Sequence, residues 1–364
     1  MKKVLFVLPI ILLVSVLIVG GCAKPAPNLV PPPTGTDLLN KAFKESGGQT
    51  VDLVVDQEIR DVTVDMFNWW MVKGNIQPYY RVWWPEMHYE ANFVKHGDKM
   101  GVIIKEMIWP YYTEFDCNII TQGIAFLNPD GVQIGQLVHT PKASAKGITL
   151  NSVFTFPAKT PQSFIDAMRV HCKGEMQDFT RFLPELYKQV NAKAELTPDM
   201  VPPPTGTDLL NKAFEESGGQ TVDLVVDQEV AGVTADMFMW WMHAAIQPYY
   251  RVWWPEMHYE VIMLPSGPII KEMIWPYYTE FRCNLLQLPP TQVGIGFLTP
   301  DDQKIGQLVH TPTASAKGIT LNSVFTFPAK TPQSFIDAMR VHCKGEMQDF
   351  ARFLPELYKQ KGPK

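Results

Sequence analysis

The sequence contains one long internal repeat. The segment 30–189 recurs as 201–360, and its last part is almost unchanged, since Ile134–Gln189 returns as Ile305–Gln360 with only two substitutions. A unit of about 160 residues has the size of a single domain and is too long for a solenoid or propeller repeat, whose periods run about 20–50 residues. We therefore expect a tandem duplication, with module one at 34–189, a linker at 190–204 and module two at 205–360. Any functional site should then occur twice.

The first 21 residues have the order of an export signal. Two lysines follow Met1, the run Val4–Val19 is almost wholly apolar, and two glycines precede Cys22. This order is typical of a secretory signal peptide. The cysteine directly after it predicts a lipoprotein, in which Cys22 carries the lipid and anchors the exported chain to a membrane on its extracytoplasmic side. A simple N-terminal anchor helix is the alternative. The proline-rich segment 22–33 would be a stiff spacer.

The composition favours two globular domains and gives no sign of a nucleic-acid partner. Hydrophobic residues make up 46% of the chain, which includes ten tryptophans, and the net charge of -5 leaves no basic surface for nucleic acid. Each module has two cysteines, Cys117 and Cys172 in the first and Cys283 and Cys343 in the second. Export would allow a disulfide in each module. The place of Cys172 on an apolar helix face instead favours buried free thiols.

The periodicity of module one predicts an α+β domain. Helices are expected at 37–46, 63–72 and 162–187, and Pro184 should kink the last of them or end it early. Strands are expected at 50–59, 79–84, 102–108, 123–127, 133–139 and 148–156. The long C-terminal helix has one apolar stripe, formed by Phe164, Met168, Cys172, Phe179 and Phe182. We expect this helix to lie across the concave face of a curved antiparallel sheet and to close a cavity.

Two polar residues interrupt the inward side of that helix. His171 and Glu175 are four residues apart, so they lie one above the other on the same helix face. A histidine and a glutamate at this spacing are usually ordinary surface neighbours. Here they lie on or beside the apolar stripe, where an unpaired carboxylate is costly to bury. A bound metal ion would remove that cost, because both side chains can reach one cation.

Two further ligands are expected from the sheet. His88 follows the aromatic segment 79–84, and Glu106 is a lone carboxylate in the apolar strand 102–108. Alternatively, His88 is a hydrogen-bonded core histidine and Glu106 faces outward beside a cation. Together with His171 and Glu175 they form a set of two histidines and two carboxylates, which suits zinc or a similar divalent ion.

Four pieces of module one, in this order and spacing, resemble the 2,4-diacetylphloroglucinol hydrolase family, which includes phloretin hydrolase. They are Pro-Tyr-Tyr-Arg-Val-Trp-Trp-Pro-Glu-Met-His at 78–88, the strand glutamate at 106, the stretch 139–156, and His-Cys-Lys-Gly-Glu-Met at 171–176. The resemblance implies a Bet v 1-like helix-grip fold in each module and a zinc-dependent hydrolase. Such an enzyme cleaves the carbon–carbon bond between a polyhydroxylated aromatic ring and an acyl group with a metal-activated water.

The resemblance also implies which residues form the site. One zinc ion per module would be bound by His88, Glu106, His171 and Glu175 in module one and by His258, Glu272, His342 and Glu346 in module two. Tyr80 looks like a family tyrosine that contacts phenolic hydroxyls, although it can equally be a core residue, and His139 matches a second-shell or substrate-contacting histidine. Either Glu106 or Glu175 could leave the metal briefly to act as the base, and the sequence does not choose between them. Asn151 is a geometric guess for the pocket wall. The counterparts in module two are Tyr250, His310, Glu272 and Asn322.

The sequence departs from the family in three ways. Little sequence precedes the catalytic region, which suggests that the two modules pair with each other in place of a separate subunit contact. The loop 91–105 is longer than its counterpart 261–271, which allows the two pockets to differ. Export is unexpected for such an enzyme. Two other functions therefore stay open: a membrane-tethered module that binds an aromatic ketone or another hydrophobic molecule without catalysis, and an interaction protein whose paired modules raise avidity.

Overall fold

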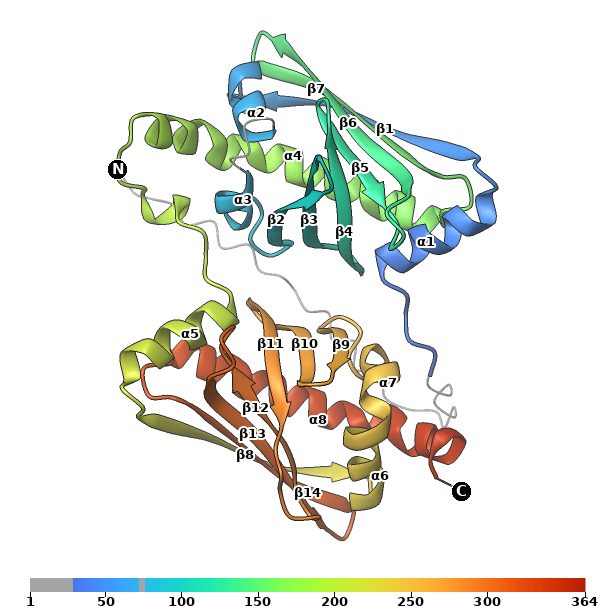
Figure 1. The fold of residues 1–364 in the computed structure, drawn as a ribbon, viewed down its shortest axis with the longest axis vertical. Helices are drawn as coiled ribbons and strands as arrows, with labels where there is room; N and C mark the ends of the chain where they lie inside the picture. Colours follow the sequence, from blue (N-terminus) through green and yellow to red (C-terminus); the bar gives the residue numbers. More distant parts are fainter. Residues whose placement is uncertain (1–28, 72–75, 364) are drawn as a thin grey trace, which may run out of the picture.

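The protein consists of two modules of the same architecture (Figure 1). The computed structural model describes residues 29–71 and 76–363. The expected signal peptide and Cys22 lie outside the described residues, as does most of the expected spacer. Within the described ranges, no helix is long and apolar enough to cross a membrane.

Each module begins with a short capped helix. In module one, α1 (Gly35–Ser46) starts after Thr34, whose hydroxyl accepts a hydrogen bond from the Asp37 backbone N–H while the Asp37 carboxylate accepts one from the Thr34 N–H. This reciprocal arrangement satisfies two backbone donors that the first helical turn leaves free. The helix ends at Gly47, which adopts the left-handed conformation that glycine tolerates best.

A seven-stranded antiparallel sheet forms the body of module one, in the order β1-β7-β6-β5-β4-β3-β2. The sheet curves around the long C-terminal helix α4 (Gln162–Asn191), as Figure 1 shows. The buried face of α4 includes all five residues of the predicted apolar stripe. The predicted α+β helix-grip fold is thus confirmed. The strands are β1 (Thr50–Arg60), β2 (His88–His96), β3 (Lys99–Ile108), β4 (Tyr111–Ile120), β5 (Gly123–Leu127), β6 (Gln133–Ser144) and β7 (Gly147–Pro157).

The prediction of a strand at 79–84 is wrong. After α2 (Val64–Met71), the chain forms α3 (Ile76–Tyr79) and a 3-10 turn at Tyr80–Val82, and β2 starts only at His88. The aromatic residues that suggested a strand instead bury the inner side of this turn, since Tyr80 and Trp83 are three residues apart and both buried. His88 is therefore the first residue of a strand that the sequence reading missed, as it also missed β4.

Pro184 does not end the C-terminal helix, so of the two expected effects, a kink or an early end, the early end is wrong. The helix α4 continues through Pro184 to Asn191. Leu183 and Leu186, on either side of the proline, have no exposed surface. Burying two leucine side chains contributes about 3–6 kcal/mol, which offsets the roughly 3 kcal/mol that a proline inside a helix costs.

Module two repeats this architecture, with sheet order β8-β14-β13-β12-β11-β10-β9. A short 3-10 helix, η2 (Pro198–Met200), lies in the linker before it. All four cysteines of the two modules are free and buried, as predicted. The elements are α5 (Gly206–Ser217), β8 (Thr221–Ala231), α6 (Ala235–Trp240), a π-helix at Trp241–Ala245, α7 (Ile246–Trp253), β9 (His258–Leu264), β10 (Gly267–Ile274), β11 (Tyr277–Leu285), β12 (Val293–Leu298), β13 (Lys304–Ala314), β14 (Gly318–Pro328) and α8 (Gln333–Lys361).

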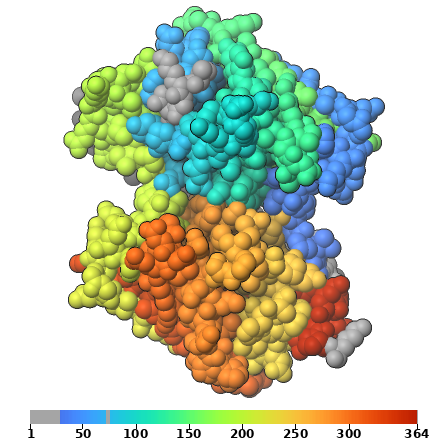
Figure 2. Space-filling view, viewed as in Figure 1, coloured from blue at the N-terminus to red at the C-terminus, as the bar shows by residue number. Residues whose placement is uncertain are grey.

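The two modules pack against each other through a shared aromatic cluster, which we call the tyrosine interface. Its strands β2–β4 and β9–β11 face one another in Figure 1, and Figure 2 shows the modules in direct contact. The hydroxyls of Tyr89 and Tyr259 are 3.0 Å apart and form a hydrogen bond. Tyr89 stacks on Tyr278 with ring centroids 4.6 Å apart, and Tyr112 stacks on Tyr259 at 4.5 Å. Met107 and Met273 complete the buried cluster.

Ion pairs flank the tyrosine interface on both sides. Lys105 of module one contacts Glu280 of module two at 2.6 Å, and Lys271 of module two contacts Glu114 of module one at the same distance. Each lysine also contacts a glutamate of its own module, at 2.7 Å for Lys105 and Glu90. These crossed pairs relate the modules by an approximate twofold axis, so the expected pairing of the modules is present within the chain.

Candidate metal centre

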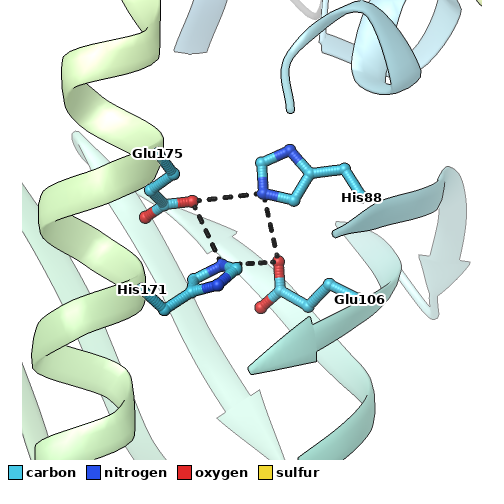
Figure 3. Close-up of side chains that lie close together, drawn as sticks. All are labelled: His88, Glu106, His171 and Glu175. Carbon is cyan, nitrogen blue, oxygen red and sulfur yellow. Dashed lines mark ion pairs between the residues drawn. The ribbon is translucent and has the colours of Figure 1, made fainter. Parts of the chain in front are cut away.

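Four side chains from three elements converge inside module one (Figure 3). His88 opens β2 and pairs in register with Glu106 of β3, while His171 and Glu175 come from adjacent turns of α4. The Nε2 atom of His88 lies 3.4 Å from Glu175 Oε2 and 3.8 Å from Glu106 Oε2. The Nε2 atom of His171 lies 3.6 Å from each of the same two oxygens. The structure thus brings together all four residues that the sequence suggested as ligands.

The spacing of these four atoms fits a tetrahedral metal site. Zinc binds histidine nitrogen and carboxylate oxygen at about 2.0–2.2 Å, so the ligand atoms of a tetrahedral site lie about 3.4 Å from one another. The four nitrogen–oxygen separations in module one run from 3.4 to 3.8 Å, and all four donor atoms lie within 4.8 Å of one another. These distances are too long for hydrogen bonds and match a shared cation.

The two histidine donor atoms lack hydrogen-bond partners. All four side chains are buried, and the Nε2 atoms of His88 and His171 make no hydrogen bond to any described residue. A buried polar atom without a partner costs about 1–3 kcal/mol. Two such nitrogens aimed at the same two carboxylates would therefore be an expensive arrangement without a cation, and a divalent ion satisfies all four groups.

The charges of the quartet support the same conclusion. Burial would raise the pKa of Glu106, but the imidazoles of His171 and His88 outweigh burial and hold that pKa below its usual range. In module two, burial and then the neighbouring Glu272 raise the pKa of Glu346 well above its usual range. Burial beside a second carboxylate thus favours the neutral form of Glu346, and a cation between the two groups would favour the charged form of both.

Residues around the quartet fix the orientation of the ligands. The Tyr80 hydroxyl donates a 2.6 Å hydrogen bond to Glu106 Oε2, and the Tyr80 ring stacks on His88 with centroids 4.4 Å apart. The Trp83 indole N–H donates to the backbone carbonyl of Glu175 at 2.6 Å. Such outer contacts set the direction in which metal ligands point. Tyr80 therefore has a role at the metal centre in addition to any contact with substrate.

A tryptophan packs against the helix at the His171–Glu175 turn. The Trp84 indole stacks on the His171 ring with centroids 5.2 Å apart, and it lies directly over Gly174. A Cβ atom at Gly174 would overlap Trp84 Cη2 and lie 2.8 Å from Cζ3. The glycine inside the His-Cys-Lys-Gly-Glu-Met motif is thus required by this close approach. Sequence reasoning missed it, although a glycine in mid-helix is itself a signal.

Three members of the quartet, Glu106, His171 and Glu175, line a cavity of about 530 Å³ in module one. Most of the cavity wall is apolar, with side chains such as Phe115, Phe126 and Met168. His139 also lines it. The Nδ1 atom of His139 lies 2.8 Å from Ser152 Oγ, and its Nε2 atom has no partner among the described residues. Burial lowers the pKa of His139 to about 4, so its ring is neutral near pH 7.

Asn151 does not line the pocket. Its amide nitrogen donates a 2.7 Å hydrogen bond to Asp56 on the neighbouring strand β1, on the outer face of the sheet. Side chains alternate between the two faces of a strand. The adjacent Ser152 therefore points inward to His139, and Asn151 points outward. Asn322 of module two makes the same outward contact, with Asp227.

Module two contains a second quartet with nearly the same geometry. The nitrogen–oxygen separations between its two histidines and two glutamates run from 3.4 to 3.9 Å. Tyr250 donates a hydrogen bond to Glu272, and Trp253 donates to the carbonyl of Glu346, as their counterparts do in module one. The residues of this second quartet are His258, Glu272, His342 and Glu346.

Comparisons with known proteins add little to this geometry. No protein-family model matches the sequence, and neither does any curated protein. Among solved structures, the di-domain ARO/CYC BexL from the BE-7585A biosynthetic pathway aligns over 83% of this chain and 97% of its own, with 10% identity and a TM-score of 0.29. The di-domain ARO/CYC StfQ from the steffimycin biosynthetic pathway aligns over 85% and 99%, with 12% identity and a TM-score of 0.27. Such scores are too low to indicate a shared chemistry.

Proposed function

We propose that this protein is a divalent-metal-dependent hydrolase that cleaves the carbon–carbon bond between a polyhydroxylated aromatic ring and an acyl group. The observation that carries the proposal is that three members of the buried metal-ligand quartet, Glu106, His171 and Glu175, line a ligand-sized apolar cavity. Ligand pockets have volumes of about 300–1,000 Å³ and combine apolar walls with a few converging polar groups. The resemblance of the motifs to the 2,4-diacetylphloroglucinol hydrolase family supports the same reaction.

Different residues around the cavity would have different roles in this reaction. Zinc held by the quartet would supply a Lewis acid for the ketone oxygen and a bound water of lowered pKa. Glu106 and Glu175 are the only carboxylates among the described residues that line the cavity, so one of them takes the proton of the attacking water. The base would have to leave the metal for this step, and Glu175 would leave more easily because Tyr80 holds Glu106 by a hydrogen bond.

The aromatic ring must accept the electron pair of the broken bond. Water adds its oxygen to the acyl carbon, the bond to the ring breaks, and the ring carbon takes a proton, which gives a carboxylic acid and a phenol. Ring hydroxyls make this possible, because their keto tautomers spread the charge. Neutral His139 lines the cavity, its Nε2 atom has no partner among the described residues, and this atom would hold such a hydroxyl. Burial raises the pKa of Tyr80, so its proton stays on the hydroxyl that fixes Glu106.

The test is to measure metal content and product release together. The purified chain should bind two zinc ions and should release acid and phenol from an acylphloroglucinol. The double variant His171→Ala/His342→Ala should lose both zinc ions and all turnover. The exposed His243→Ala serves as the control and should change neither. If the double variant keeps two zinc ions, the assignment of the ligands is wrong.

Binding without catalysis is the second candidate function. The apolar wall of the module one cavity supports it, because such a wall would hold an aromatic ketone or another hydrophobic molecule whether or not a bond is cleaved. Under this alternative the zinc-loaded chain binds the acylphloroglucinol and releases it intact. Detection of the intact ketone with no acid after prolonged incubation would decide for the binding function.

A further inference from the structure

The two modules differ sharply in the size of their cavities. The cavity of module one has a volume of about 530 Å³, whereas the cavity beside the second quartet has about 60 Å³. A water molecule occupies about 30 Å³ of liquid, and small-molecule pockets start at about 300 Å³. The module two cavity can therefore hold one or two waters next to its metal ligands but not an aromatic ring with an acyl chain.

The deep part of the cavity does not account for this difference, because it is the same in both modules. Its residues are identical in type and line both cavities: Phe115 and Phe281, Phe126 and Phe297, Leu137 and Leu308, Phe154 and Phe325, and Met168 and Met339. The tyrosine, the tryptophan and three of the four metal ligands also line both cavities. The modules must therefore differ at the rim.

The first rim difference lies on the helix after β1 or β8. Asn68 lines the cavity of module one, but its counterpart is Met239, which is partly buried and packs against the core of module two. The neighbouring positions do not differ, because Met71 and Ile76 line the cavity of module one as their counterparts Met242 and Ile246 line the cavity of module two. A larger apolar side chain thus replaces an amide at this side of the rim.

The second rim difference lies in one hairpin turn. In module one the turn between β4 and β5 is only 121–122, and this turn and the strand residues beside it, 119–120 and 123–124, line the cavity. In module two the connection 286–292 and the strand ends beside it replace this turn, and none of the residues 285–294 lines the cavity. Leu288 of this longer connection instead lies near Gly294 of β12. The part of the cavity that reaches this turn in module one is absent from module two.

We propose that each chain binds one substrate molecule, in module one, and that module two is a metal-binding module that supports module one without accepting substrate. The substrate class rests on the proposed function. The division between the modules, in which module one alone binds substrate, rests on the different volumes of the two cavities. Module two would stabilise module one through the tyrosine interface. Tyr89 and Tyr259 hydrogen bond to each other, and each directly follows a proposed metal ligand, His88 or His258.

The stoichiometry of ligand binding tests this division. The probe is 4-hexylresorcinol, which has a polyhydroxylated ring and an apolar tail but no acyl group to cleave. Titration calorimetry of the chain loaded with two zinc ions should give one bound probe per chain. Asn68→Met, which installs the module two residue in module one, should weaken binding at least fivefold. The matched variant Met239→Asn should not change the affinity of the site in module one.

The outcomes separate this proposal from the proposed function. Two bound probes of equal affinity per chain, or an unchanged affinity in Asn68→Met, would overturn the division between the modules even if acylphloroglucinol is hydrolysed. One bound probe per chain, together with no hydrolysis of acylphloroglucinol in a separate assay, would support the division and reject the hydrolase. Absence of any bound probe would overturn the division and the choice of substrate class together.

Discussion

The hydroxyl of Tyr80 donates a 2.6 Å hydrogen bond to Glu106 Oε2, the same oxygen that faces both histidines of the quartet. This contact directs Glu106 toward the two histidines. His171 and His88, and to a smaller extent Tyr80, lower the pKa of the Glu106 carboxyl despite its burial. Burial raises the pKa of Tyr80 and so keeps its proton in place. The orientation of this candidate ligand is therefore set by a residue outside the quartet.

The substitution Tyr80→Phe should weaken metal binding in module one. It removes the donor to Glu106 and keeps the ring that stacks on His88, so zinc affinity should fall about 10–100-fold, as is usual when an outer contact of a metal ligand is lost. Competition with a chelator should show one weakened site and one unchanged site per chain. Tyr250→Phe should weaken the other site alone. Two unchanged sites in Tyr80→Phe would mean that the hydrogen bond does not orient Glu106.

The substitution Gly174→Ala should disturb the same centre through packing. The new methyl group overlaps the Trp84 indole, which stacks on His171, and forced overpacking costs about 1–3 kcal/mol. Thermal unfolding and zinc content should both decrease. The second-site change Trp84→Phe removes the overlapping ring atoms and should restore part of the zinc binding. A Gly174→Ala variant with normal stability and normal zinc content would show that Trp84 can move freely.

The stability of the zinc-free protein should depend on His139 at acid pH. Burial lowers the pKa of His139 from 6.5 to about 4, so between these values the unfolded chain binds a proton that the folded chain does not. The free energy of unfolding should therefore fall as pH falls from 6.5 to 4, by about 3 kcal/mol from this histidine, and should not depend on it above pH 6.5.

Urea unfolding at several pH values measures this contribution. His139→Gln should show a smaller loss of unfolding free energy between pH 7 and pH 4 than the unchanged protein does. His243→Gln, at an exposed position, should keep the full loss. An equal loss in all three proteins would mean that His139 is protonated in the folded state as readily as in the unfolded chain.

The crossed ion pairs should stabilise the contact between the modules. Lys105→Met leaves the carboxylates of Glu90 and Glu280 without their cation, and the loss of such charged hydrogen bonds should lower the free energy of unfolding by about 2 kcal/mol. Lys188→Met breaks an exposed ion pair with Glu185 and should change the free energy of unfolding by less than about 0.5 kcal/mol. Denaturant unfolding of both variants compares them directly, and equal small effects would show that the interface does not need these charges.

We also propose that Cys22 is the lipid-modified first residue of an exported mature chain. Cells that express the full sequence should incorporate labelled palmitate into this protein, and the protein should fractionate with membranes. Cys22→Ser should lose both the label and the membrane association, while Cys117→Ser, at a buried free thiol, should keep both. A full-length Cys22→Ser protein that remains in the membrane fraction would instead indicate an uncleaved anchor helix.

Local patterns in the sequence were sufficient for several features of this protein. The duplication follows from direct comparison of the two halves, and the apolar stripe of α4 follows from helical periodicity. The spacing of His171 and Glu175 places them on one face of any helix, because adjacent turns superimpose residues four apart. The free state of Cys172 follows from its place on the buried side of the same helix.

Tertiary structure alone decided the features that depend on contacts distant in sequence. The aromatic segment 79–84 has strand-like residues, but burial of Tyr80 and Trp83 against the core makes it helical and so places Tyr80 beside Glu106. The inward or outward direction of Asn151 depends on the register of β7 with β1, which no local pattern fixes. The different volumes of two cavities with the same deep residues depend on how rim segments pack, and only the folded chain brings those segments together.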